Sequence, residues 1–396
     1  MRISLINKHW LVMVTIYVHG ITCLLSAESK IFRLFTYPIE NIPNSMTTKL
    51  MNTKVLLTNS NKEYPPVISN PTVFQRTIKN GEIPKYAIDY SPVIQLHSKE
   101  KYYPYDINLF IRHFQITKNQ FPVQKQLQLS TITHNDENLY MTAIEEFCND
   151  PDWILGTKPD SQGLSDPAVL IVVDKGNGWV DAYWFYFYAF NLGPTIKFKS
   201  INLIIMGPIG NHVGDWEHTL VRFYNGEPIL VWLSAHSGGN GAYYQDIPKF
   251  NHSKQPLIYS ALGTHANYVT PGKQNRDPSG ILSDRTDSGA IWIPSRNYLS
   301  YTFDGQYTYI GNHNNDKQHL GREQQYGSWL HFLGHWGDQR LSNKDFRQRQ
   351  YMSQLYKYVD GPQGPLTKNL MRVSPCPNGD SLQWWKWWAR CNVKIK

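Results

Sequence analysis

The sequence predicts a mainly β protein with a β-sandwich core and a few short helices, and an α+β arrangement is the alternative. Its 396 residues are 41% hydrophobic and 18% charged, so the chain can bury a large core. Thirteen Trp and 25 Tyr favour strands, because aromatic side chains pack well on pleated sheets. The 24 Pro and 27 Gly are typical of turns that join strands. This composition excludes disorder, collagen and coiled coil as the main state.

Residues 1–27 are typical of a signal that directs a chain into the secretory pathway. Arg2 and Lys8 precede an apolar run over residues 10–25, and Ala27 supplies a small residue where a signal peptidase cuts. The segment is therefore a cleaved signal peptide or, if it is retained, the anchor of a single-pass type II membrane protein. Both alternatives place the rest of the chain in the lumen.

The rest of the chain divides into a polar arm and one domain. Residues 28–83 are rich in Asn, Thr, Ser and Lys and lack sustained periodicity, which indicates an exposed arm or stalk. Residues 84–396 are expected to form a single β-rich domain. Its first part contains two short strand-like pieces, at residues 86–90 and 93–97, and an amphipathic helix candidate at residues 137–147.

Two apolar runs later in the domain predict a core hairpin. Residues 169–174 and 179–190 flank the turn sequence Lys175-Gly176-Asn177-Gly178. The second run is interrupted by Asp181 and is too short to span a membrane as a helix. We therefore expect two buried strands here.

The formal net charge of +8 is scattered along the chain. The sequence has no long basic run, no aromatic RNA-binding box and no zinc-finger spacing, so nucleic acid is not expected as a partner. A mildly basic surface is compatible with membrane or sorting partners, because it attracts anionic groups. The oligomeric state stays open.

Cysteine usage and one glycosylation sequon agree with a lumenal chain. Cys23 lies within the signal, which leaves Cys148, Cys376 and Cys391. In an oxidising compartment Cys376 and Cys391, close together in the tail, are the natural disulfide pair, and three reduced thiols are the alternative. Asn251, in the sequence Asn-His-Ser, is the candidate N-glycosylation site.

A second predicted hairpin carries the candidate chemistry. Side chains alternate along a strand, so Asp215 and Glu217 share one face and Trp216 lies on the other. A two-residue loop at Asn225-Gly226 would pair Asp215 with His236, and a four-residue loop would pair Glu217 with His236. A three-residue loop would place His236 opposite Trp216. Two registers of three therefore predict a His236–carboxylate contact.

Neighbouring histidines extend this pair into a polar cluster of nitrogen and oxygen ligands. The metal-ligand candidates are His212, Asp215, Glu217 and His236. Such a set suits one divalent cation, Zn²⁺, Mn²⁺ or Mg²⁺, with Ca²⁺ possible if waters and carbonyls complete the shell. The same groups without metal suit general acid and base work, and the alternative is a solvated strand face with structural histidines. Further polar candidates are His265, Asp284, His335 and Asp338.

Absent motifs narrow the chemistry further. The sequence has no G-x-S-x-G elbow, so a serine hydrolase is not expected. It has no G-x-G-x-x-G and no P-loop, which removes dinucleotide and nucleoside triphosphate chemistry from the leading options. No catalytic residue follows from spacing alone.

The motif Gly210-Asn211-His212-Val213-Gly214-Asp215-Trp216-Glu217-His218-Thr219 strongly resembles the vacuolar protein sorting-associated protein 62 family of fungi. The likeness extends in the same order from about Tyr86 to the C-terminus. It includes the segments at residues 151–156, 172–178, 185–188, 259–266, 284–287, 334–338 and 361–365. The resemblance implies a role in the trafficking of proteins to the vacuole, and a location in the vacuole or endomembrane lumen.

A second resemblance concerns the site. The order of Asp215-Trp216-Glu217-His218, then residues 234–239, then residues 263–265 is similar to that of necrosis-inducing secreted proteins. Those are β-sandwiches that hold a divalent cation through His, Asp and Glu and act at membrane surfaces. The resemblance implies His212, Asp215 and Glu217 as ligands, and it departs at Gly214, where that family has a second His.

These observations predict a non-enzymatic secretory-pathway factor in vacuolar protein trafficking. A metal-dependent hydrolase of the secretory or vacuolar lumen is one alternative, because a bound cation activates water. A metal-assisted module that binds lipid or glycan is the other. The sequence leaves the choice between an enzyme and a binding protein open.

Overall fold

The computed structural model describes residues 74–132, 134–198, 203–236, 238–276, 282–311, 327–352 and 355–375. The predicted signal, most of the predicted arm, and both members of the predicted Cys376–Cys391 disulfide lie outside the described residues. Apart from Met352, the described elements belong to the larger of two compact units, residues 65–351 with 355–396. The mainly β class is confirmed.

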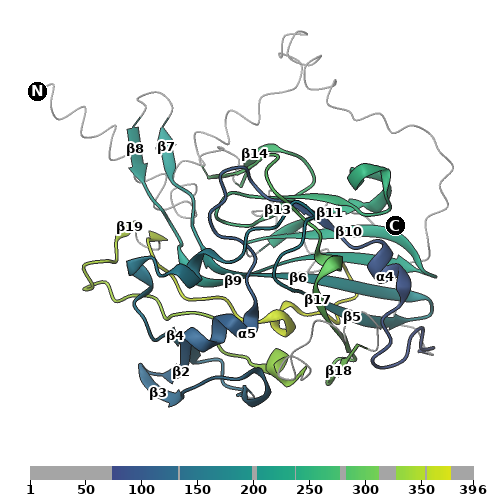
Figure 1. Ribbon diagram of the computed structural model, residues 1–396, viewed down its shortest axis with the longest axis horizontal. Helices are drawn as coiled ribbons and strands as arrows, with labels where there is room; N and C mark the ends of the chain where they lie inside the picture. Colours follow the sequence, from purple (N-terminus) through teal and green to yellow (C-terminus); the bar gives the residue numbers. More distant parts are fainter. Residues whose placement is uncertain are drawn as a thin grey trace, which may run out of the picture. The chain divides into compact units, whose positions relative to one another are not determined.

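A seven-stranded sheet forms the centre of this unit (Figure 1). β5 and β17 pair in parallel and every other neighbouring pair is antiparallel. The order across the sheet is β11 (Gly238–Tyr243), β10 (Glu227–Ala235), β9 (His212–Tyr224), β6 (Trp179–Asn191), β5 (Ala168–Gly176), β17 (Tyr298–Phe303) and β18 (Thr308–Ile310). The predicted core hairpin is β5 with β6, and the predicted second hairpin is β9 with β10.

A smaller sheet covers one face of the central sheet. It has the order β13 (Asn267–Tyr268), β12 (Leu257–Ser260), β1 (Val93–Gln95) and β16 (Ile291–Trp292). Trp292 meets Tyr186 of β6 edge-on, with ring centroids 5.3 Å apart. Together with Trp184 and Ile258 these side chains form one buried core. The predicted strand at residues 93–97 corresponds to β1.

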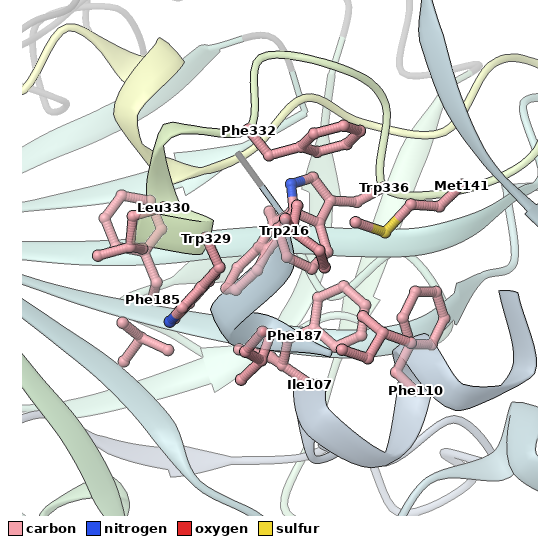
Figure 2. Close-up of a cluster of buried hydrophobic side chains, with 14 of the residues drawn as sticks. Ile107, Phe110, Met141, Phe185, Phe187, Trp216, Trp329, Leu330, Phe332 and Trp336 are labelled. Carbon is pink, nitrogen blue, oxygen red and sulfur yellow. The ribbon is translucent and has the colours of Figure 1, made fainter. Parts of the chain in front are cut away.

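A second core fills the opposite face of the central sheet (Figure 2). Trp216 of β9 points into this core and meets Trp336 edge-on at 5.6 Å and Phe187 of β6 at 4.8 Å. Phe110, in the helix α5 (Ile107–Phe110), packs on Phe187 at 4.6 Å. Beyond α5 lies a three-stranded sheet of β3 (Phe121–Gln124), β2 (Phe114–Lys118) and β4 (Leu139–Ala143). Because both faces of the central sheet are covered, all thirteen residues of β6 are buried, which explains its nearly continuous apolar sequence.

Short elements complete the unit. They are α4 (Lys85–Asp89), the strand pairs β7 (Ile196–Phe198) with β8 (Leu203–Met206), β14 (Gly272–Asn275) with β15 (Ser283–Thr286), and β19 (Gln350–Met352) with β20 (Leu355–Tyr356). Single turns of 3₁₀-helix occur at η2 (Ile111–His113), η3 (Leu129–Thr131), η4 (Phe147–Asn149), η5 (Asp152–Leu155), η6 (Tyr244–Asp246), η7 (Phe250–His252), η8 (Pro294–Arg296), η11 (Gly327–His331) and η12 (Pro365–Lys368). None of the helices within the described ranges is both long and apolar enough to cross a membrane.

Two local predictions were wrong. Residues 137–147, expected to be an amphipathic helix, contain β4, whose Leu139 and Met141 alternate into the core while the strand pairs with β2. Residues 86–90, expected to be a strand, form α4, where Ala87 is buried. In both segments the few apolar residues fit the repeat of a helix as well as that of a strand. Packing against neighbouring segments therefore determined which of the two formed.

Residues 74–83, placed at the end of the polar arm by the sequence, pack on the domain. Asp174 of β5 accepts hydrogen bonds from the backbone N–H groups of Thr77 and Ile78, at 2.9 and 3.2 Å. Ile78 and Ile83 are buried. These ten residues therefore contribute apolar contacts to the core beside β5.

Candidate functional site

Strand β9 carries Asp215 and Glu217 on the face that points toward the smaller sheet. Asp215 lies opposite Tyr188 of β6 and Glu217 lies opposite Tyr186. Both carboxyl side chains are buried, with 6% and 4% of the residue surface exposed. The alternation predicted for these two residues is thus present, and it places two carboxyl groups in a layer between two sheets.

Gly214 precedes this pair for a steric reason. Its φ is +68°, and a Cβ at this position would lie 1.8 Å from the carbonyl oxygen of Trp336. No side chain fits there. The close packing of the Trp336 backbone therefore requires glycine at this position.

A β-bulge changes the register that the sequence predicted. The loop at Asn225-Gly226 has two residues, as one of the predicted registers required, and Glu227 pairs with Tyr224. Ile229 is then an extra residue, and the last pair of the ladder is Leu233 with Thr219. If this register continued for three more residues along each strand, His236 would lie opposite Trp216. The prediction that His236 pairs across the ladder with Asp215 or Glu217 was therefore wrong.

His236 instead turns out of the sheet and contacts Asp284 of β15. Its φ is +59°, and its Nε2 lies 2.8 Å from Asp284 Oδ2. Tyr268 donates a hydrogen bond to the same oxygen at 2.6 Å, and Thr264 donates to Asp284 Oδ1 at 3.1 Å. Burial alone would raise the pKa of Asp284, but the hydrogen bond and charge of His236 outweigh it and lower this pKa.

His265 forms a second pair with Asp215. Its Nδ1 lies 2.8 Å from Asp215 Oδ2 and its Nε2 lies 3.1 Å from the carbonyl oxygen of Tyr102. Burial alone would lower the pKa of His265, but the hydrogen bond to Asp215 and the charge of Glu100 raise it. Since both ring nitrogens face acceptors, this geometry favours the doubly protonated, positively charged imidazole. The ring also stacks on Tyr188 at a centroid distance of 3.7 Å.

Glu217 lies between the two histidine–aspartate pairs. The Ser234 hydroxyl hydrogen-bonds to one of its oxygens, and the backbone N–H of His236 donates to the other at 3.3 Å. Burial, and then the charge of Asp215, raises the pKa of Glu217 well above its usual range. Asn267 donates to Ser234 Oγ at 3.5 Å. The site thus contains a carboxyl group that tends to keep its proton beside two aspartates that pair with histidines.

The predicted ligands do not form a cation site as they are placed. Within the part of the chain that the structure describes, no group of three or more His, Cys, Asp and Glu side chains is arranged to hold a metal ion. His212 Nδ1 hydrogen-bonds to the Gly214 carbonyl at 2.6 Å, and His236 faces a carboxylate. Ligation of a divalent cation by His212, Asp215, Glu217 and His236 therefore stays a prediction.

The remaining predicted residues lie elsewhere. His335 stacks on Tyr140 of β4 at 4.4 Å, and Asp338 accepts a hydrogen bond from the backbone N–H of Ala143 at 3.2 Å. Both belong to the opposite face of the central sheet. Asn251 is exposed in η7, and Cys148 is a free thiol.

Two residues of the site, Glu100 and Tyr268, could not be predicted from any motif or periodicity in the sequence. Glu100 accepts the backbone N–H of Gly263 at 2.8 Å and lies 3.8 Å from His265, although Lys99-Glu100-Lys101 is typical of a solvated loop. Tyr268 lies in a strand of only two residues. Contacts between residues more than 160 positions apart, as between Glu100 and Gly263, require the tertiary structure.

The fold and the site together define a class: β-sandwich proteins with a buried His, Asp and Glu cluster at one end of the central strands. The chain belongs to the family described as vacuolar protein sorting-associated protein 62, whose model matches residues 79–361. A relative in Saccharomyces cerevisiae described as putative vacuolar protein sorting-associated protein TDA6 is 40% identical over 84% of this chain and 77% of its own length. Vacuolar protein sorting-associated protein 62 of the same yeast is 40% identical over 80% of this chain and 72% of its own length. Membership associates the chain with a vacuolar protein sorting-related role and with the vacuole or endomembranes.

Solved structures of other proteins resemble this chain only weakly. NLPPya in complex with mannosamine has a TM-score of 0.25 at 12% identity, over 53% of this chain and 75% of that one. The non-toxic HaNLP3 protein has a TM-score of 0.27 at 14% identity, over 56% of this chain and 79% of that one. Scores this low carry no argument about the site.

Proposed function

We propose that the chain acts in vacuolar protein sorting as a non-enzymatic factor of the secretory-pathway lumen that binds a polar ligand at the β9 site. One observation carries the proposal. Polar side chains from β9, β13, β15 and the turns after β10 and β12 converge at one end of the sheet. Such convergence of separate segments is typical of a binding site.

The outer edge of this site is accessible to a ligand. The His236 side chain is 25% exposed, and so is that of Arg276, whose guanidinium lies 3.9 Å from Asp284. Deeper in, Asp215 and His265 are buried. A ligand would therefore contact the cationic edge first, while the buried pairs hold the strands and turns that present it.

The test is a sorting assay with matched histidine variants. His236→Ala is expected to divert a soluble vacuolar hydrolase into the medium, because it removes the exposed member of the site. His252→Ala is the control, since His252 is exposed in η7 with a similar φ of +57° and lies outside the site. Equal sorting in both variants, with both proteins folded, would refute the proposal.

A lumenal hydrolase is the second candidate, and one observation favours it. Glu217, with its raised pKa, lies on the same face of β9 as Asp215, whose charge contributes to that rise. A carboxyl group with a raised pKa beside a second carboxyl group is an arrangement used for acid and base catalysis. Glu217→Gln is expected to keep the fold, because the amide matches a protonated carboxyl in shape. Turnover of ester, glycoside or phosphate substrates that disappears in Glu217→Gln would replace the non-enzymatic proposal.

The predicted cation is tested separately. Elemental analysis compares the purified full chain, prepared with metals supplied, with its Asp215→Ala and Glu217→Ala variants. One equivalent of a divalent metal that is lost in both variants would establish these ligands and support a metal-assisted lipid or glycan binding module. A metal-free wild type would contradict the predicted cation and support the histidine–aspartate pairs as the functional state of the site.

A further inference from the structure

A second polar cluster lies on the reverse face of β9, beneath the segment that follows η12. His218, the last residue of the Asp-Trp-Glu-His motif, points away from Glu217 and is 4% exposed. Its ring stacks on Phe185 of β6 at 4.9 Å, yet neither ring nitrogen has a hydrogen-bond partner among the described residues. A buried polar atom without a partner costs about 1–3 kcal/mol. An imidazole enclosed in this way is a candidate to bind a water molecule, an ion or another ligand.

Buried charges surround the same face. Arg222 is fully buried and donates to both carboxylate oxygens of Asp181, at 2.7 and 2.8 Å. Lys175 Nζ lies 3.6 Å from Asp181, and its side chain is 4% exposed. Arg372 is 5% exposed. Three buried cations therefore share one buried carboxylate.

The partners of Arg372 are neutral. Its Nε donates to the Pro375 carbonyl at 3.0 Å and its Nη1 donates to the Lys368 carbonyl at 2.8 Å, while Nη2 is buried and has no partner in the described ranges. Carbonyl oxygens satisfy hydrogen bonds but supply no opposite charge. Counted over the described residues, Arg222, Lys175 and Arg372 thus bring two positive charges more than Asp181 neutralises, and Arg372 Nη2 is a donor without a partner there.

The Tyr183 ring of β6 has both Arg372 and His218 as neighbours. The Arg372 guanidinium lies 5.2 Å from the centre of the Tyr183 ring, and the His218 ring lies 6.1 Å from it. Burial, and then the charges of Arg372 and Lys368, lowers the pKa of His218 well below its usual range. Lys368 is partly buried, and its backbone carbonyl accepts the hydrogen bond from Arg372 Nη1.

We propose that His218, Lys368 and Arg372 bind a phosphate-class oxyanion on the reverse face of β9. A dianion offsets most of this positive charge, and it accepts hydrogen bonds from the imidazole N–H, from the lysine and from the arginine Nη2. The flanking Met371 and Val373 are 40% and 45% exposed, so the segment that carries Arg372 lies at the surface. This inference is independent of the function proposed for the opposite face.

The experiment measures thermal unfolding of the full chain with inorganic phosphate and with sodium chloride at the same ionic strength. Phosphate is expected to raise the unfolding temperature above the chloride value, because a ligand that binds only the folded state stabilises it. In Lys368→Gln the affinity is expected to fall at least about tenfold, as one charged hydrogen bond is lost. Lys344→Gln, which removes the same charge from an exposed loop, is the matched control and keeps the wild-type response.

His218→Leu separates the proposal from a purely structural role. Without phosphate, this variant is expected to be at least as stable as the wild type, because it removes two unpartnered polar atoms. With phosphate, its increase in unfolding temperature is expected to disappear. An identical phosphate response in His218→Leu, Lys368→Gln and wild type would overturn the proposal, as would a wild type that responds equally to phosphate and chloride.

A final arm distinguishes two sources of the same anion. The full chain is mixed with phosphatidylcholine vesicles, with and without phosphatidic acid, and co-flotation is measured. Lys368-dependent flotation that needs phosphatidic acid assigns the site to a lipid headgroup. A response to inorganic phosphate without flotation assigns it to a free phosphate. A chain that shows neither response lacks the site.

Discussion

Asp338 is expected to make the protein more stable in acid than at neutral pH, and Asp338→Asn is expected to remove that dependence. Its Oδ2 is buried and has no hydrogen-bond partner in the part of the chain that the structure describes, and burial, which is the largest cause, raises the pKa of Asp338 from 3.8 to about 7. The folded state therefore holds a proton that the unfolded chain releases. The stability that depends on this proton is complete below about pH 4 and is lost as the pH rises through the folded pKa.

The size of the effect follows from the two pKa values. The folded and unfolded pKa values differ by about three units, which corresponds to a change in the free energy of unfolding on the order of 4 kcal/mol. About 3 kcal/mol of this change occurs between pH 4.5 and pH 7.5. Asn is neutral at every pH, and its oxygen can accept the same backbone N–H from Ala143. The free energy of unfolding of Asp338→Asn, relative to that of the wild type, is thus expected to rise by about 3 kcal/mol from pH 4.5 to pH 7.5.

Urea unfolding at pH 4.5, 6 and 7.5, followed by tryptophan fluorescence, measures this difference. Asp345→Asn is the control, because hydrogen bonds from Arg347 lower the pKa of Asp345 to about 2. It is expected to bring no stabilisation at pH 7.5. A constant difference between Asp338→Asn and wild type across the three pH values would refute the reasoning.

Three further substitutions test the packing of the central sheet, each by urea unfolding against the wild type. Asp215→Ala is expected to cost about 3–5 kcal/mol, because it leaves the buried His265 imidazolium without its carboxylate, and a loss below about 1 kcal/mol would contradict that pairing. Gly214→Ala is expected to cost more than about 2 kcal/mol, since its Cβ would collide with the Trp336 carbonyl, and an unchanged midpoint would show that the backbone can move aside. Asp181→Ala is expected to cost about 3–5 kcal/mol by leaving buried cations unpaired, and wild-type stability in chloride buffer would argue against the charge count on that face.

The fold class and its hairpins were predictable because they depend on local patterns. Alternating and continuous apolar runs bounded by Asn-Gly turns predicted the β5–β6 and β9–β10 hairpins, and both are present. Residues 86–90 and 137–147 were not predictable in the same way. Their few apolar side chains suit a helix or a strand, and the pairing of β4 with β2 decided one of them.

The site was predictable in part for the same reason. The sequence placed Asp215 and Glu217 on one face of a strand, because side-chain alternation is a property of the strand itself. It did not predict the bulge at Ile229, which turned His236 away from these carboxylates. Nor did it reveal Glu100, whose contact with His265 depends on a loop that is distant in sequence.

The sequence by itself determined the mainly β class, the two hairpins, the face on which the carboxyl groups lie and the family to which the chain belongs. Only the tertiary structure decided which histidine meets which aspartate. Asp215 pairs with His265, 50 residues away, and His236 pairs with Asp284, 48 residues away. Such contacts arise when separate strands and turns pack together, and burial then removes the water that would otherwise screen each charge. The same burial raises the pKa of Glu217 and leaves His218 without a partner, two properties that no local pattern encodes.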